Sequence, residues 1–134
     1  GGLTYNRVLF SGLGTGTFTV SGSNTFDTLS IENPPHTLIG TAGTTQTIIN
    51  ANGLSGTGGS LNTLRSTSST NFILSKPSGT VSCDYLSLTD STATGGAQWF
   101  AGNNSIDLGD NPGWIFSSAP TSSLANSLML MGVG

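Results

Sequence analysis

The sequence predicts an all-β fold, a right-handed parallel β-helix with about three short strands per turn. Three observations favour it: helix-type periodicity is almost absent, short strand-like runs recur along the chain, and these runs repeat at a regular spacing. The alternative is an antiparallel jelly-roll or β-sandwich, because short strands with turn signals every 8–12 residues or so are also typical of those folds.

The strand-like runs are rich in β-branched or aromatic residues and are bounded by Gly, Pro, Asn or Ser, as strands usually are. In chain order they are "GTFTVSG", "FDTLSIEN", "HTLIGTAG", "QTIINANG", "LNTLRSTS", "NFILSKPSG", "CDYLSLTD", "AQWFAG" and "GWIF". Apolar residues do not recur at helical spacing in any window of these segments. We therefore expect strands almost throughout, with one short helix candidate in the last segment, "SSLANSLMLMGVG".

A repeat is visible when residues 26–60 are set above residues 61–96. Three runs then align with three runs at a period of about 35 residues, which lies in the range typical of solenoids. The alignment matches the following pairs: Thr28 with Thr63, Leu29 with Leu64, Leu38 with Ile73, and Gly43 with Gly79. Residues 97–116 read as a third, shortened turn and residues 8–22 as a partial first turn.

The 134 residues fit one domain, and only 7% of them are charged, against about 25% in ordinary globular proteins. We expect a single β domain over residues 1–119 and an apolar C-terminal docking or oligomerisation segment over residues 120–134. The net charge is −3, and the only cations are Arg7, Arg65 and Lys76. Nucleic-acid binding requires a set of cations that face phosphates, and anionic membranes attract the same chemistry, so we expect neither partner.

The chemistry-bearing residues do not form a catalytic pattern, so we expect no enzyme activity. Cys83 is the only cysteine and reads as a small buried apolar residue. His36 is the only histidine and follows a Pro-Pro turn, without a nucleophile motif nearby. The six carboxylates do not mark a converging pair of the kind that glycosidases use. They are Asp27, Glu32, Asp84, Asp90, Asp107 and Asp110.

The loop "NNSIDLGDNPG" gathers oxygen-bearing side chains and is the first candidate binding segment. Its candidate residues are Asn103, Asn104, Asp107 and Asp110. Calcium prefers such ligands, but the spacing does not match an EF-hand. We expect a surface loop of Asx-turns and no cofactor, with a weak calcium site as the alternative.

The second candidate group is aromatic and consists of Trp99, Phe100 and Trp114. Exposed aromatic rings bind sugars or partner proteins, whereas buried rings can plug the open end of a solenoid. Capping or core packing is the first interpretation, and surface recognition is the second. The tail beyond these rings carries a third candidate group, Leu124, Leu128, Leu130 and Met131. We expect these residues to be buried in an oligomer or against the domain, because an exposed apolar terminus promotes aggregation.

The stretch "GTVSCDYLSLTDSTATGGAQWFAGNNSIDLGDNPGWIF" resembles a segment of tailed-bacteriophage virion structural proteins. The shared pattern is a Tyr-Leu strand, an Asp-Ser turn, Ala-Thr-Gly-Gly-Ala, an aromatic pair, Ala-Gly, a polar loop and Gly-Trp-Ile-Phe. Here it runs from Tyr85-Leu86 through Trp99-Phe100 to Gly113–Phe116. The resemblance extends upstream to Phe26 and therefore covers about 90 residues, but it brings no catalytic residues with it.

The resemblance implies a non-enzymatic protein on the virion surface, in a tail fibre or spike or as a capsid decoration protein. Such a protein attaches to the host or stabilises the particle. The resemblance also implies a homo-trimer that contacts other virion proteins. The alternative is a carbohydrate-binding module that recognises host surface glycans through aromatic and Asn/Asp side chains.

Overall fold

The chain folds as a right-handed parallel β-helix of about five turns. The computed structural model describes residues 2–50 and 53–120, which contain thirteen strands and no helix. All pairs between these strands are parallel. The predicted fold class is therefore confirmed, and the antiparallel alternative is wrong for the described residues. Within residues 2–50 and 53–120 the structure has no helix long and apolar enough to span a membrane.

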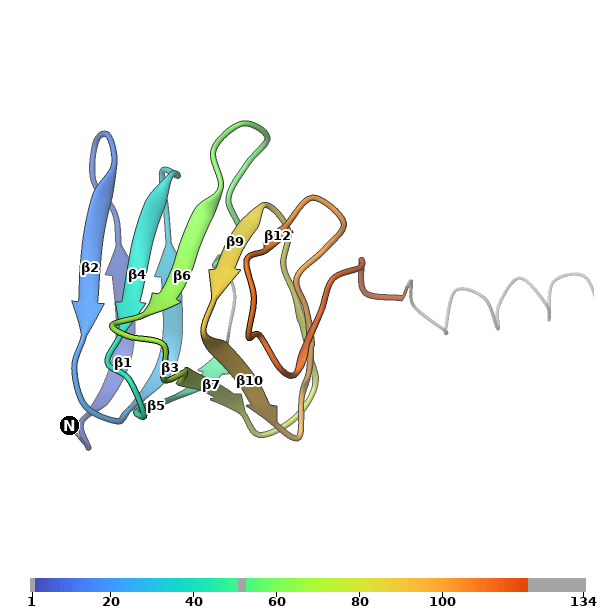
Figure 1. Ribbon diagram of the computed structural model, residues 1–134. Helices are drawn as coiled ribbons and strands as arrows, with labels where there is room; N and C mark the ends of the chain where they lie inside the picture. Colours follow the sequence, from blue (N-terminus) through green and yellow to red (C-terminus); the bar gives the residue numbers. More distant parts are fainter. Residues whose placement is uncertain (1, 51–52, 121–134) are drawn as a thin grey trace, which may run out of the picture.

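Three parallel sheets form the sides of the solenoid, and Figure 1 shows how its turns stack from β1 to β12. Sheet 1 has the strand order β1 (Thr4–Phe10), β3 (Asn24–Ile31), β5 (Thr45–Asn50), β7 (Phe72–Lys76) and β10 (Ser91–Gly95). Sheet 2 has the order β2 (Gly16–Val20), β4 (His36–Gly40), β6 (Asn62–Ser66), β9 (Leu86–Thr89) and β12 (Ile106–Asp107). Sheet 3 has the order β8 (Thr80–Ser82), β11 (Gln98–Phe100) and β13 (Trp114–Ile115).

The number of strands per turn changes along the solenoid. Sheet 3 begins only at β8, so the turns before β7 contribute one strand to sheet 1 and one to sheet 2. From β7 onward each full turn adds a strand to all three sheets. The expected three strands per turn therefore describe the C-terminal half of the solenoid.

The sequence repeat of about 35 residues is wrong, because the turns are shorter and unequal. Thr47 pairs with Ser75, 28 residues later, whereas Leu74 pairs with Ala93, 19 residues later. The predicted match of Thr28 with Thr63 joins strands of different sheets, since Thr28 lies beside Arg7 and Asn50. The residue aligned with Leu64 across the sheet is Leu38.

Equivalent inward-facing residues form columns that fill the interior. In sheet 2, Leu38, Leu64 and Leu88 lie in register on successive turns, and all three are buried. In sheet 1 the ring of Phe72 lies against the backbone of Gly40, where a Cβ would overlap the ring. The parallel register therefore sets which apolar side chains touch, and the core is one continuous cluster.

Polar side chains satisfy the backbone at the corner that leads into sheet 2. His36 Nδ1 accepts the backbone N–H of Gly16 at 2.8 Å, and Asn62 Oδ1 accepts the N–H of His36 at 2.9 Å. Ser105 Oγ accepts the N–H of Leu86 at 2.8 Å. In each case the side chain comes from the following turn and satisfies the first residue of a strand. Such bonds allow sharp corners in the interior, because a buried N–H without a partner is costly.

Candidate functional site

The two tryptophans belong to the interior of the last turns. Trp99 is 1% exposed and Trp114 is 7% exposed, and they are neighbours in sheet 3. Their ring centroids are 5.2 Å apart with the planes at 70°, an edge-to-face arrangement that aromatic pairs favour. Phe100 is also buried, at 6% exposed. The three rings therefore pack as core and cap residues, and they do not form an exposed platform for a ligand.

Each indole N–H has a hydrogen-bond acceptor, which allows both rings to be buried. Trp99 Nε1 donates to the carbonyl oxygen of Thr94 at 3.0 Å, and Trp114 Nε1 donates to Ser91 Oγ at 3.2 Å. The turn before Trp114 depends on Gly113, which has φ +86 and lies where a Cβ would overlap the carbonyl oxygen of Ala93. Residues 111–116 thus close the C-terminal end of the solenoid.

Asp84 fixes the start of the polar loop. Its Oδ1 accepts the N–H groups of Tyr85 and Asn104, and its Oδ2 accepts Asn104 Nδ2 at 2.8 Å. Partial burial acts to raise the pKa of Asp84, but these hydrogen bonds outweigh it and hold the pKa below its ordinary value. Asp84 is therefore an ionised structural clamp between two successive turns.

The predicted loop residues Asn103, Asn104, Asp107 and Asp110 are exposed, as expected for a surface loop. Asp107 Oδ1 accepts the N–H of Gly109 at 3.0 Å, which is an Asx-turn as predicted. The same oxygen accepts Asn111 Nδ2 at 2.7 Å, so it already serves the loop itself.

The calcium alternative gains no support from side-chain geometry. Among residues 2–50 and 53–120, no group of three or more His, Cys, Asp or Glu residues is placed to hold a metal ion. Asn103 Nδ2 donates to Ser118 Oγ at 2.8 Å, and Asn104 is held by Asp84. The loop can offer amides, carboxylates and the exposed side chains of Ile106 and Leu108 to a partner, which suits recognition by contact.

The thiol of Cys83 and the imidazole of His36 are the most reactive types of side chain in the described residues, and both lie in the interior. Cys83 is 6% exposed, as predicted for a small apolar residue, and burial raises its pKa to about 12. The Asp84 charge acts in the same direction, while a hydrogen bond with Ser55 lowers the pKa. His36 is 2% exposed, and its Nδ1 is used by Gly16.

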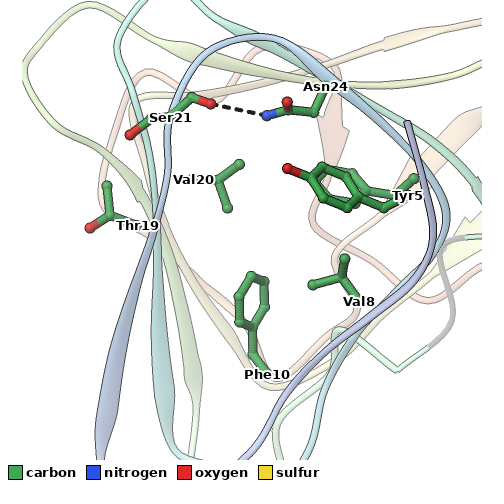
Figure 2. A pocket seen from close by; sticks show the side chains of 8 residues that line it. Tyr5, Val8, Phe10, Thr19, Val20, Ser21 and Asn24 are labelled. Atoms are coloured by element: carbon green, nitrogen blue, oxygen red, sulfur yellow. Dashed lines mark hydrogen bonds between the residues drawn. The ribbon is translucent and has the colours of Figure 1, made fainter. Parts of the chain in front are cut away.

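A hollow at the N-terminal end is a feature that the sequence did not indicate. It measures about 250 Å³ and is lined mainly by apolar side chains of the first turn (Figure 2). The signal was available in the runs "RVLF" and "TFTV", but their inward faces could be assigned only with the register. The docking residues Leu124, Leu128, Leu130 and Met131 lie outside the described residues.

Comparison with known proteins gives no further assignment: no protein-family model, curated protein or solved structure matches the chain.

Proposed function

We propose that the protein is a non-enzymatic structural component of a tailed-phage virion, exposed on the particle as part of a tail fibre or spike or as a capsid decoration. The observation that carries the proposal is the pair of uninterrupted five-stranded parallel sheets. Their hydrogen bonds join every turn to the next, which gives a stiff scaffold of the kind that must persist outside a cell.

The C-terminal turns support the same proposal. The segment that resembles phage virion proteins, from Tyr85 to Phe116, forms β9 to β13 and the closed end of the solenoid. Its aromatic pair and Gly-Trp-Ile-Phe string make the cap, and its polar loop lies on the surface. A motif that builds a stable end with an exposed loop suits a part that meets neighbours or a host surface.

The placement of the reactive groups also favours a structural role. His36 and Asp84 are used in hydrogen bonds between turns, and Cys83 is buried with a raised pKa. These side chains stabilise the scaffold through contacts that catalysis would have to break. The proposed mechanism is therefore adhesive or stabilising, with other virion proteins as partners and a homo-trimer as the working assembly.

The test is immunogold electron microscopy of phage particles whose genome encodes the chain, with antibodies raised against the purified protein. Gold on the tail tip or fibre supports a fibre or spike, and gold on the head supports a decoration protein. Particles without label, alongside labelled free protein in the same lysate, would overturn the proposal.

The second candidate function is binding of host surface glycans. It is favoured by the exposed loop residues Asn103, Asn104, Ile106 and Leu108, which offer amide and aliphatic contacts together. A binding isotherm with host polysaccharide tests it. Asn103→Ala and Leu108→Ala are expected to weaken binding several-fold, whereas Leu13→Ala, a fully exposed control elsewhere in the solenoid, is expected to leave it unchanged.

A further inference from the structure

The two ends of the solenoid differ. The C-terminal end is closed by Trp114 and the segment around it, whereas the first turn surrounds the hollow of about 250 Å³. Figure 2 shows the side chains of Tyr5, Val8, Phe10 and Val20 directed into this space. Tyr5 is 37% exposed although its ring stacks on Phe26 with centroids 5.3 Å apart. The interior of the first turn is therefore open where later turns are covered by a neighbour.

Among residues 2–50 and 53–120, β1 pairs only with β3 and β2 pairs only with β4, so within this part of the chain each is the edge strand of its sheet. Edge strands present rows of N–H and C=O groups that accept an added strand. The N-terminal end thus offers two strand edges around one apolar hollow, and the segment that fits it is extended and apolar.

The chain carries one segment with this chemistry beyond the described residues. Residues 121–134, "TSSLANSLMLMGVG", have no charged side chain and contain Leu124, Leu128, Leu130 and Met131. They follow Pro120, which comes directly after the closed C-terminal end. Fourteen extended residues span at most about 46–50 Å, so the segment is long enough to cross a solenoid end.

We propose that the C-terminal segment of one copy docks on the open N-terminal end of a second copy, where it adds a strand to the edge of β1 and fills the hollow with leucine and methionine side chains. This inference deepens the proposed function and rests on its self-assembly. The contact is heterologous, so it generates a ring if the rotation closes and a filament if it does not.

Docking on a second copy is favoured over docking on the segment's own copy by distance. Turns of a β-helix stack about 4.8 Å apart, so five turns separate the two ends by about 24 Å. A segment that returned to its own first turn would use about half of its length on the way. On a second copy stacked end to end, the whole segment is free to follow both strand edges.

The experiment is disulfide trapping between two full-length variants, Val8→Cys and Leu128→Cys, mixed in equal amounts and oxidised. We expect a mixed disulfide dimer, formed at least about ten-fold faster than in the control mixture. In the control, Val8→Cys is replaced by Leu13→Cys, which is fully exposed outside the hollow. Native Cys83 contributes little background because it is buried.

A second measurement does not depend on cross-linking. Light scattering of the full chain is expected to give a multiple of the 13.5 kDa chain mass. Leu128→Asp combined with Leu130→Asp is expected to return the mass to a single chain. Ser123→Asp combined with Ser127→Asp adds the same charge at polar positions of the segment and is expected to leave the assembly intact.

Three results would overturn the inference. The first is a mixed disulfide that forms as fast with Leu13→Cys as with Val8→Cys. The second is a disulfide that forms only within a chain carrying both Val8→Cys and Leu128→Cys, since the segment would then fill its own end. The third is a mass that the leucine substitutions do not change. Any of these would leave the virion proposal standing, because the immunogold labelling does not depend on them.

Discussion

The side-chain oxygen of Asn62 accepts the backbone N–H of His36 at 2.9 Å, one turn earlier in the solenoid. The amide nitrogen of the same side chain donates to the carbonyl oxygens of Leu54 and Ser55, both at 3.1 Å. Asn62 is fully buried, so a single side chain satisfies three backbone groups away from water. It holds the start of β4 and the segment before β6 to one corner.

Asn62→Ala is therefore expected to destabilise the protein by about 2–4 kcal/mol, because it leaves buried backbone groups without partners. Urea unfolding followed by circular dichroism measures the change. Asn103→Ala, which removes an exposed amide, is the control and is expected to change stability by less than about 0.5 kcal/mol. Equal changes in the free energy of unfolding for the two substitutions would show that the hydrogen bonds of the Asn62 side chain do not stabilise the fold.

Gly113→Ala is expected to weaken the C-terminal cap. A Cβ at this position would overlap the Ala93 carbonyl oxygen, in addition to the strain of φ +86. Gly59 has φ +80 with no atom near the Cβ position, so Gly59→Ala isolates the backbone strain. We expect Gly113→Ala to cost about 1–3 kcal/mol more than Gly59→Ala in urea unfolding. The idea fails if the two substitutions cost the same.

The burial of the tryptophans predicts low accessibility to acrylamide. Trp99→Phe leaves Trp114 as the only tryptophan, and with excitation selective for tryptophan its acrylamide quenching constant is expected to be several-fold smaller in the folded protein than in urea. Trp114→Ala is expected to destabilise the fold by about 3–5 kcal/mol, as large aromatic truncations in cores do. Acrylamide quenching as strong in the folded protein as in urea would show that the Trp114 ring is exposed. An aromatic surface for ligand binding would then again be a valid interpretation.

Asp84→Asn is expected to change how stability depends on pH. The folded-state pKa of Asp84 is lowered, so its ionised form contributes stability above the unfolded pKa, and this contribution is lost as the pH falls through the folded pKa. In the variant, an amide N–H₂ group would face Asn104 Nδ2, two donors together. We expect a loss of about 1 kcal/mol at neutral pH that disappears once the pH has fallen below the lowered folded-state pKa of Asp84. If the stability difference between the native protein and Asp84→Asn stays constant from neutral to acidic pH, the ionised carboxylate of Asp84 does not stabilise the fold.

Cys83 is expected to resist thiol reagents in the folded protein. Its pKa of about 12 leaves almost no thiolate near pH 8, and its burial blocks access. Labelling with a thiol reagent at pH 8, read by mass spectrometry, should therefore require urea. Rapid modification of the folded chain would contradict both the burial and the raised pKa.

The fold class could be predicted from the sequence, but the register could not. Short runs such as "HTLIG" and "NTLRS" have the composition of strands, which depends on local preference. The register instead depends on contacts such as that of Asn62 with His36, 26 residues apart. The turns have unequal lengths because the segment between β5 and β6 is long and because sheet 3 appears only later. A fixed repeat therefore aligned β3 with β6, which belong to different sheets.

The features of the candidate site could likewise be predicted only where they depend on local sequence. The exposed loop and its Asx-turn at Asp107 followed from local residue types, because an aspartate near glycine bonds its own backbone. The position of Trp99 and Trp114 could not be assigned, since exposure depends on which strand lies on the next turn. The hollow beside Tyr5 was missed for the same reason: an open end is a property of the stacked turns.

Because each turn contacts only the turns before and after it, the number of turns is independent of the chemistry of the two ends. A chain with one more copy of the β5–β6 turn would keep the same hollow and the same tryptophan cap, set farther apart by one strand spacing. Gain or loss of a whole turn would therefore change the end-to-end length of the solenoid in steps of about 4.8 Å. The residues that make contacts at either end would stay the same.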